Sequence, residues 1–219
     1  MIIAFGNLKG GVGKSTLCLT LATYWSSIGK DIHVVDTDMQ QSLDTTRQEE
    51  LEEDPSLVPP YPIEFKLLCE FVKELPQRSK TDKILMVDLP GTYDNDVMAV
   101  MCYADVIIVP FLYEDWSLDA TSKFAAYIDI IDEEFPEMKG TAIFVPNHVN
   151  KSIGRKEDKE HWEAWRQQII DSGVILAPLI GYRACMQHHN SIIYSKEIRQ
   201  CTEESFKFIT DIVFKQPIN

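Results

Sequence analysis

Two hydrophobic patterns alternate along the chain. Short uninterrupted apolar runs have the length of buried strands, and they fall at residues 2–6, 31–36, 63–67, 84–88, 106–110, 141–145 and 174–177. Longer segments between them, such as 118–131 and 161–170, carry apolar residues three and four positions apart with charged residues in the gaps. The alternation predicts one α/β domain over residues 1–219, with a mostly parallel, twisted sheet between two layers of helices.

One segment interrupts the alternation. Residues 49–62 are acidic at first and then rich in proline. We expect a surface excursion here and not a domain boundary, because the strands on either side are needed for one sheet.

Composition narrows the class of protein. The 219 residues are 45% hydrophobic and 25% charged, which is typical of a globular domain and excludes a disordered chain. No stretch approaches the roughly 20 apolar residues of a membrane helix, and no basic leader precedes the first strand, so we expect a cytoplasmic protein. The five cysteines form no C-x-x-C pair, which favours free thiols over disulfides or a thiolate metal site.

Charge is distributed unevenly. The net charge of −13 argues against a protein that coats nucleic acid with its whole surface. Residues 1–138 carry −15, whereas residues 139–219 carry +2, so a polyanion site is expected in the last third of the chain. Unequal solvation of the surface would also produce this asymmetry.

The first strand leads into a glycine-rich segment, residues 6–16 (GNLKGGVGKST), and then into a helix predicted over residues 14–28. Glycines lack a Cβ, so several backbone N–H groups can converge on one anion, and the positive end of the helix points at the same place. Lys14 can reach the outer phosphates of a nucleotide, and the Ser15 hydroxyl can ligate Mg²⁺. The segment therefore predicts a phosphate-binding loop.

A dinucleotide-binding fold is the competing interpretation. Gly11 and Gly13 could begin G-x-G-x-x-G, and Asp36 ends the second strand, where an acid would bind the ribose. Thr16 replaces the third glycine, however, and Lys14 has no role in that motif. We therefore favour a nucleoside triphosphate.

The order Lys9 to Thr16 (KGGVGKST) resembles the deviant Walker A box of the ParA/MinD family of P-loop ATPases. The ordinary G-x-x-x-x-G-K-[ST] pattern is not met, because Leu8 stands at its first glycine and Lys9 follows. The resemblance implies a P-loop NTPase fold, with ATP and Mg²⁺ as ligands. The residues that it implies for nucleotide binding in this loop are Lys9, Gly10, Gly11, Val12, Gly13, Lys14, Ser15 and Thr16.

Two later segments resemble the switch and Walker B segments of that family. Residues 36–42 (DTDMQQS) are similar to its D-x-D-P-Q segment, with Met39 in place of proline. Asp88 follows four apolar residues, as a Walker B acid does, and Gly91 could sense a terminal phosphate. The metal-binding residues implied are Ser15, Asp38 and Asp88.

Resemblance of lower specificity covers the last third of the chain. Residues 141–150 resemble a strand that ends in an adenine-reading asparagine, which implies Asn147, with Asn150 as the alternative. Residues 176–180 resemble the closing strand of the family and add Pro178 to the expected nucleotide site.

The family's mechanism assigns catalytic roles to three residues. Its members form a face-to-face dimer around ATP, which implies that Lys9 reaches the phosphates of the other subunit. Lys14 would stabilise developing negative charge, and Asp38 would orient or deprotonate the attacking water, or else be an outer partner of Mg²⁺. Hydrolysis would then loosen the homodimer.

The start of the loop at residue 9 resembles the short ParA type, which segregates plasmid, chromosomal or mobile DNA together with an adaptor protein that binds the centromere-like site. Such ATPases bind DNA non-specifically in the dimeric state, through basic residues late in the chain. The candidates here are Arg155, Lys156, Lys159, Arg183, Lys196, Arg199, Lys207 and Lys215.

A MinD-like ATPase that acts at a membrane or on a protein cargo is the alternative. Residues 205–215 are apolar but contain only two lysines and an aspartate, so we expect a docked final helix and no membrane partner. Iron–sulfur carriers on this fold need paired cysteines, and no suitable pair is visible. A regulatory protein that binds nucleotide without hydrolysis is a third class.

Overall fold

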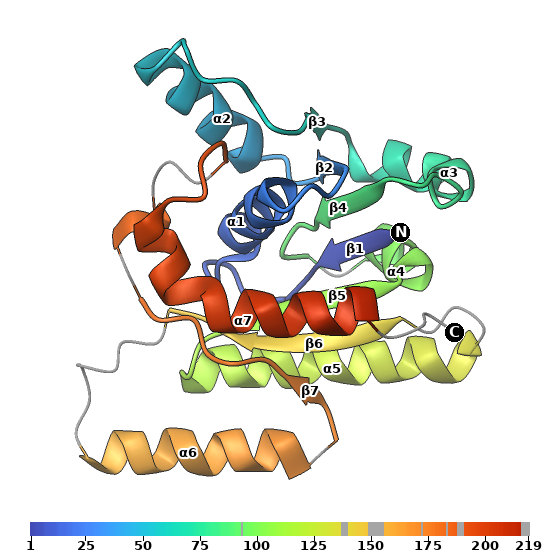
Figure 1. Cartoon of the computed structure of the whole chain (residues 1–219). Helices are drawn as coiled ribbons and strands as arrows, with labels where there is room; N and C mark the ends of the chain where they lie inside the picture. The colour runs from blue at the N-terminus through green and yellow to red at the C-terminus, as the bar shows by residue number, and fades with distance from the viewer. Residues whose placement is uncertain are drawn as a thin grey trace.

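The computed structural model describes residues 1–92, 94–136, 140–148, 156–171, 173–182, 184–187 and 191–215. Within this part of the chain, a seven-stranded sheet lies between two layers of helices (Figure 1). The strands are β1 (Ile2–Phe5), β2 (Ile32–Asp36), β3 (Ile63–Phe65), β4 (Ile84–Asp88), β5 (Val106–Phe111), β6 (Thr141–Pro146) and β7 (Ile175–Leu176). All neighbouring strands run parallel, in the order β3-β2-β4-β1-β5-β6-β7.

The helices are α1 (Lys14–Ser27), α2 (Ser42–Glu53), α3 (Leu68–Arg78), α4 (Asn95–Tyr103), α5 (Asp115–Glu134), α6 (Lys156–Asp171) and α7 (Lys196–Lys215), with a short 3-10 helix at Ala184–Gln187. One core cluster joins α1, α2 and α7 to the sheet, and it includes the fully buried Trp25 and Phe206. The other joins α3, α4 and α5, with Phe71 and Phe124 fully enclosed. Figure 1 shows these two sets of helices on opposite faces.

The predicted α/β architecture is confirmed. Each expected strand is present, and every bound lies within two residues of the prediction. The runs at β1, β4 and β5 are buried along their whole length, which is why uninterrupted apolar sequence identified them. Strand β7 is shorter than its apolar run because only Ile175 and Leu176 pair with β6.

The excursion at residues 49–62 is only partly irregular. Its acidic start belongs to α2, which ends at Glu53, and the proline-rich remainder returns the chain to β3. Glutamate is compatible with this helix, where Glu49, Glu52 and Glu53 face solvent and Glu50 is buried against Ser191.

The topology brings several loops to one edge of the sheet. Strand β1 is central, flanked by β4 and β5, and β2 pairs with the other side of β4. In open parallel sheets the loops at the carboxyl ends of such central strands form the ligand crevice. The loops after β1, β2, β4 and β6 therefore meet at this edge. No helix in the described part of the chain has the length and apolar character needed to cross a membrane.

Candidate functional site

The glycine-rich segment forms a tight loop between β1 and α1. Gly11 and Gly13 adopt left-handed backbone conformations, with φ of 77° and 92°. A Cβ on Gly13 would also lie 2.3 Å from Nδ2 of Asn147, so a side chain there would clash as well as strain the backbone. The loop ends at the amino terminus of α1, where the first backbone N–H groups and the positive end of the helix dipole face an anion.

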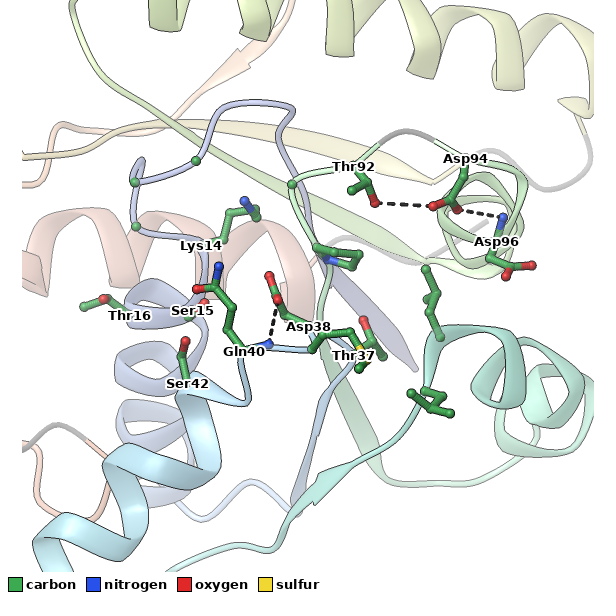
Figure 2. A pocket seen from close by; sticks show the side chains of 18 of the residues that line it. Lys14, Ser15, Thr16, Thr37, Asp38, Gln40, Ser42, Thr92, Asp94 and Asp96 are labelled. Carbon is green, nitrogen blue, oxygen red and sulfur yellow. Dashed lines mark hydrogen bonds between the residues drawn. The ribbon is translucent and has the colours of Figure 1, made fainter.

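A cavity of about 890 Å³ opens in front of this loop. Four loops, each following a strand of the sheet, contribute to its wall, together with the start of α3. Its lining residues are Gly10, Gly11, Gly13, Lys14, Ser15, Thr16, Thr37, Asp38, Met39, Gln40, Ser42, Leu67, Leu68, Cys69, Pro90, Gly91, Thr92, Asp94, Asp96 and His148. Figure 2 shows Lys14, Gln40 and Asp38 around one space, with Thr92 and Asp94 across from them.

Lys14 is the buried cation of the site. Only 8% of the residue is exposed, and a Cβ built on Gly91 would lie 3.4 Å from its Nζ. Desolvation lowers the pKa of Lys14, while the nearby Asp88 and Asp38 carboxylates act to raise it. An ammonium held in this position gains most from a further anion in the cavity.

Asp88 is a buried carboxylate at the end of β4. It is 1% exposed, and neither of its oxygens accepts a hydrogen bond within the described part of the chain. Burial raises the pKa of Asp88 to about 7, and the charges of Asp36 and Asp38 add to the rise. The nearby Ser15 hydroxyl and Lys14 ammonium act in the opposite direction and lower this pKa. A carboxylate without a partner beside a serine hydroxyl fits a hydrated Mg²⁺, which uses few protein ligands and keeps several waters.

The loop after β2 is held by its first acid. Both oxygens of Asp36 accept backbone hydrogen bonds, one from the Asp38 N–H (3.0 Å) and one from the Leu43 N–H (3.1 Å). Asp36 is completely buried in this role, so it does not offer the exposed ribose-binding carboxylate of a dinucleotide fold. The Thr37 hydroxyl donates to the Asp88 carbonyl at 2.6 Å, which ties this loop to the end of β4.

Asp38 and its neighbours line the cavity. An oxygen of Asp38 accepts a hydrogen bond from the Gln40 backbone N–H (3.0 Å). Met39, which stands where the resembling motif has proline, is 71% exposed. The carboxylate of Asp38 therefore reaches the same space as Lys14.

Lys9 differs from Lys14 in its position. It is half-buried, and among the described residues it is not part of the cavity lining. Its backbone N–H donates to the side chain of Asn7, whose own amide is buried against Pro110 and Thr121. The loop backbone at Lys9 is thus anchored, and Lys9 is not among the described residues that line the cavity.

Asn147 lies directly beside the phosphate-binding loop. Its amide nitrogen donates to the Val12 carbonyl at 2.8 Å, and its Oδ1 is buried without a hydrogen-bond partner in the described structure. The next residue, His148, lines the cavity, whereas Asn147 and Pro178 do not. The Pro178 carbonyl instead accepts a hydrogen bond from the Ser205 hydroxyl. Asn150 lies outside the described residues.

His148 was missed by sequence reasoning. The only signal was its position directly after a candidate asparagine at the end of a strand. Nothing in the local pattern shows that its backbone is left-handed, with φ of 53°, or that its ring reaches the cavity.

The basic candidates for DNA binding lie late in the chain. Lys196, Arg199 and Lys207 are exposed on α7, where Lys207 pairs with Glu203 at 2.8 Å and Arg199 lies over the Tyr194 ring. Lys156 and Lys159 belong to α6, and Lys215 ends α7. Arg155 and Arg183 fall outside the described residues.

The apolar side of α7 is occupied within the domain. Phe206, Ile209 and Val213 are buried in the core cluster that α7 shares with α1. The expectation of a docked final helix is thus confirmed for the described part of α7.

The geometry defines a P-loop nucleotide-binding protein, and comparison with known families agrees. Residues 3–185 match the CobQ/CobB/MinD/ParA nucleotide-binding domain, so the chain belongs to this family. The ParA/MinD resemblance of residues 9–16 is thereby confirmed. Comparison with curated protein sequences gives no significant match.

Several solved structures have folds similar to that of this chain. A plasmid partition protein from Borrelia burgdorferi is 16% identical, with a TM-score of 0.69, and the match covers 96% of this chain and 98% of that one. An McdA variant from Cyanothece in complex with ATP is 15% identical, with a TM-score of 0.75 and coverage of 100% and 98%. Cobyrinic acid a,c-diamide synthase from Mycobacterium smegmatis, with bound ADP and magnesium, is 15% identical, with a TM-score of 0.70 and coverage of 99% and 96%.

Proposed function

We propose that the protein binds ATP with Mg²⁺ in the cavity after β1 and hydrolyses it. The observation that carries the proposal is a buried ammonium, Lys14, close to a buried carboxylate, Asp88, whose oxygens accept no hydrogen bond from the described residues. Each group lacks the counterpart that a triphosphate and its metal ion would provide. The ATP and the ADP with magnesium in the two structural relatives support the same ligands.

The loop and its helix would hold the phosphates. The backbone N–H groups of residues 10–16 surround them, and Lys14 neutralises their outer charge. Ser15 and Asp88 would hold Mg²⁺, directly or through water. Bound Mg²⁺ bridges phosphate oxygens and offsets the negative charge that develops during transfer.

Asp38 is positioned to act on the attacking water. It lines the cavity close enough to Lys14 to influence its pKa, and its backbone is fixed through Asp36. A carboxylate there can orient a water molecule or accept its proton, or it can serve as an outer partner of the metal ion.

Nucleotide state would control assembly. Lys9 is not among the residues that line its own cavity, and its ammonium would reach the phosphates of a second copy in a face-to-face homodimer. Loss of the terminal phosphate would remove what the loops after β2 and β4 contact, and the dimer would then separate.

The process that such a switch serves is proposed to be DNA partition. The similarity to a plasmid partition protein supports this role, as does the excess of basic over acidic residues in the last third of the chain. Dimerisation would double the basic residues exposed on α7 and allow weak, non-specific DNA binding by an acidic protein. A separate site-binding adaptor would then link the ATPase to its cargo.

Retardation of a DNA fragment by the wild-type protein, with ATP, with ADP and without nucleotide, tests this role. We expect binding only with ATP, and we expect it to weaken steeply as salt rises. A Lys14→Ala variant serves as the control without nucleotide binding. ATP-dependent flotation with acidic liposomes, in the absence of DNA binding, would instead support a MinD-like role.

A further inference from the structure

Helix α2 carries the loop after β2 from the cavity into the rest of the domain. Figure 2 shows Gln40 and Ser42, which line the cavity, where this loop enters the helix. The entry residue, Gln41, has a left-handed backbone with φ of 51°, and its side chain does not cap the first turn. Asp36 bonds the Leu43 N–H, but one such bond does not fix the rotation of a helix or its position along its axis. Contacts further along α2 are therefore needed to place it.

The side of α2 that faces the domain is mostly charged. Among the residues described for this helix, the buried ones are Leu43, Arg47 and Glu50, whose spacing of four and three positions forms one stripe. Arg47 is only 4% exposed and Glu50 only 3%. Apolar packing has no preferred direction, whereas a hydrogen bond requires a particular distance and angle. Because this stripe has one apolar member, the placement of α2 depends mainly on hydrogen bonds.

Both buried charges converge on Ser191, which is itself fully buried. Arg47 and Glu50 make four hydrogen bonds to its hydroxyl and backbone, with lengths between 2.6 and 2.9 Å. Arg47 also donates from Nη1 to the Tyr61 carbonyl at 3.0 Å, and the Tyr61 hydroxyl shares a hydrogen bond with that of Thr23 on α1 (2.8 Å). The network thus fixes α2 against two other parts of the domain.

A displacement of α2 would reach the cavity. Arg47 is five residues beyond Ser42, about 7.5 Å along the helix axis, so the two move together as parts of one rigid element. Asp38 is bonded to the entrance of this helix: its carboxylate accepts from the Gln40 N–H and its carbonyl from the Gln41 N–H, each at 3.0 Å. A shift of about 1 Å in a group that acts on the reacting atoms can slow a reaction by about 100-fold.

We propose that Arg47 and Glu50 are positioning residues for hydrolysis: through Ser191 they fix α2, and α2 holds the loop that carries Asp38 against the bound nucleotide. The inference rests on the proposed hydrolysis and adds what keeps this loop in place. A buried charged network can often be replaced by apolar residues without loss of stability, but such residues do not reproduce its directional contacts. Lys14 belongs to α1, so the network should affect turnover more than nucleotide affinity.

The double variant Arg47→Met with Glu50→Leu tests this role, because it removes both charges together. We expect its kcat for ATP to fall by about 10- to 100-fold, while the Kd for Mg-ATP stays within about threefold of the wild type. Without nucleotide, backbone hydrogen exchange should be about tenfold faster in residues 37–45 and unchanged in residues 10–16. Val213→Ala, a core substitution on α7, is the control that lowers stability without changing the network, and it should keep the wild-type kcat.

Ser191→Ala is a milder variant that tests the same role if the double variant does not fold. It removes the hydroxyl and leaves both backbone contacts, and it should lower kcat by about 3- to 10-fold. If the wild type hydrolyses ATP and these variants keep its kcat and its exchange rates, the positioning role is wrong and the proposed function stands. An equal loss of kcat in Val213→Ala would attribute the effect to general stability and also overturn the role. A wild type that binds ATP without hydrolysing it would overturn the proposed hydrolysis together with this inference.

Discussion

At the scale of single residues, the site is defined by charged groups whose burial is only partly compensated by the rest of the protein. Lys14 is desolvated, and the cavity in front of it offers room for a charged ligand. Burial of the Lys14 charge is unfavourable without a ligand, and the same ammonium should provide most of the attraction for phosphate.

Lys14→Ala is expected to lower nucleotide affinity by about 100-fold or more, because charge-assisted contacts to phosphate are lost. The fold should persist, since the substitution removes a group that burial penalises. Titration with a fluorescent ATP analogue measures the first effect, and thermal unfolding without nucleotide measures the second. Affinity within a few fold of the wild type would contradict the assignment of the phosphate-binding loop.

Asp88 is a carboxylate whose negative charge is disfavoured by burial. Asp88→Asn is therefore expected to stabilise the protein without nucleotide at pH 8. The folded protein keeps the proton of Asp88 up to about pH 7, whereas the unfolded chain loses it near 3.8, so the free energy of unfolding falls as pH rises between these values. Removing the charge should recover at most about 4 kcal/mol at pH 8 and much less at pH 5. The variant should also lose the dependence of nucleotide binding on Mg²⁺.

Guanidinium denaturation at pH 5, 6.5 and 8 checks the expected change with pH. Asp31→Asn is a suitable control, because the side chain of Asp31 is 70% exposed and its replacement should have little effect at any pH. An Asp88→Asn protein that is destabilised equally at all three pH values would show that burial does not raise the pKa of Asp88.

At the scale of secondary structure, α2 connects the cavity to a distant part of the chain. Its first turn is held by Asp36 through the Leu43 N–H. One turn further, two buried charged residues, Arg47 and Glu50, meet on Ser191: the guanidinium donates to its hydroxyl and carbonyl (2.8 Å each), and the carboxylate accepts from its N–H (2.9 Å) and hydroxyl (2.6 Å). The helix that begins at the nucleotide cavity is therefore fixed to the segment that precedes α7.

Arg47→Met should destabilise the protein by about 3–5 kcal/mol, because it removes the buried cation that Ser191 links to Glu50 and leaves the Ser191 and Tyr61 carbonyls without this donor. The double variant Arg47→Met with Glu50→Leu should regain a large part of this loss, since both desolvated charges are then absent. Denaturant titration of the single and double variants measures the coupling. A single variant within about 0.5 kcal/mol of the wild type, on the order of an ordinary surface substitution, would contradict a stabilising network of Arg47, Ser191 and Glu50.

This element also shows where sequence analysis succeeds and fails. The strands and the phosphate-binding loop follow from local pattern, because a fully buried strand must be apolar and a loop that wraps an anion must have glycine. Arg47 and Glu50 look like ordinary surface residues of an acidic segment, and their partner is about 140 residues away in the chain. His148 escapes detection for the same reason, since only the way the chain leaves β6 brings its ring to the cavity.

At the scale of the whole molecule, net charge opposes association. Each copy carries −13, so two copies repel one another unless the interface contains specific favourable charges. A bound triphosphate on its own adds negative charge to each face, and a cation from the opposite copy is then the simplest way to offset it. Lys9, which is anchored through its backbone and does not line its own cavity, is the residue that we propose for this role.

Lys9→Ala is therefore expected to bind nucleotide within about threefold of the wild type and yet to stay monomeric. Sedimentation velocity with saturating AMPPNP and Mg²⁺ should show dimers for the wild type and for Lys123→Ala, whose exposed side chain on α5 pairs with Asp119. The Lys9 variant should sediment as a monomer, because the phosphates then face each other without a neutralising charge. Normal dimerisation of the Lys9 variant would remove its role across the interface, while leaving the nucleotide site, which depends on Lys14 and Asp88, intact.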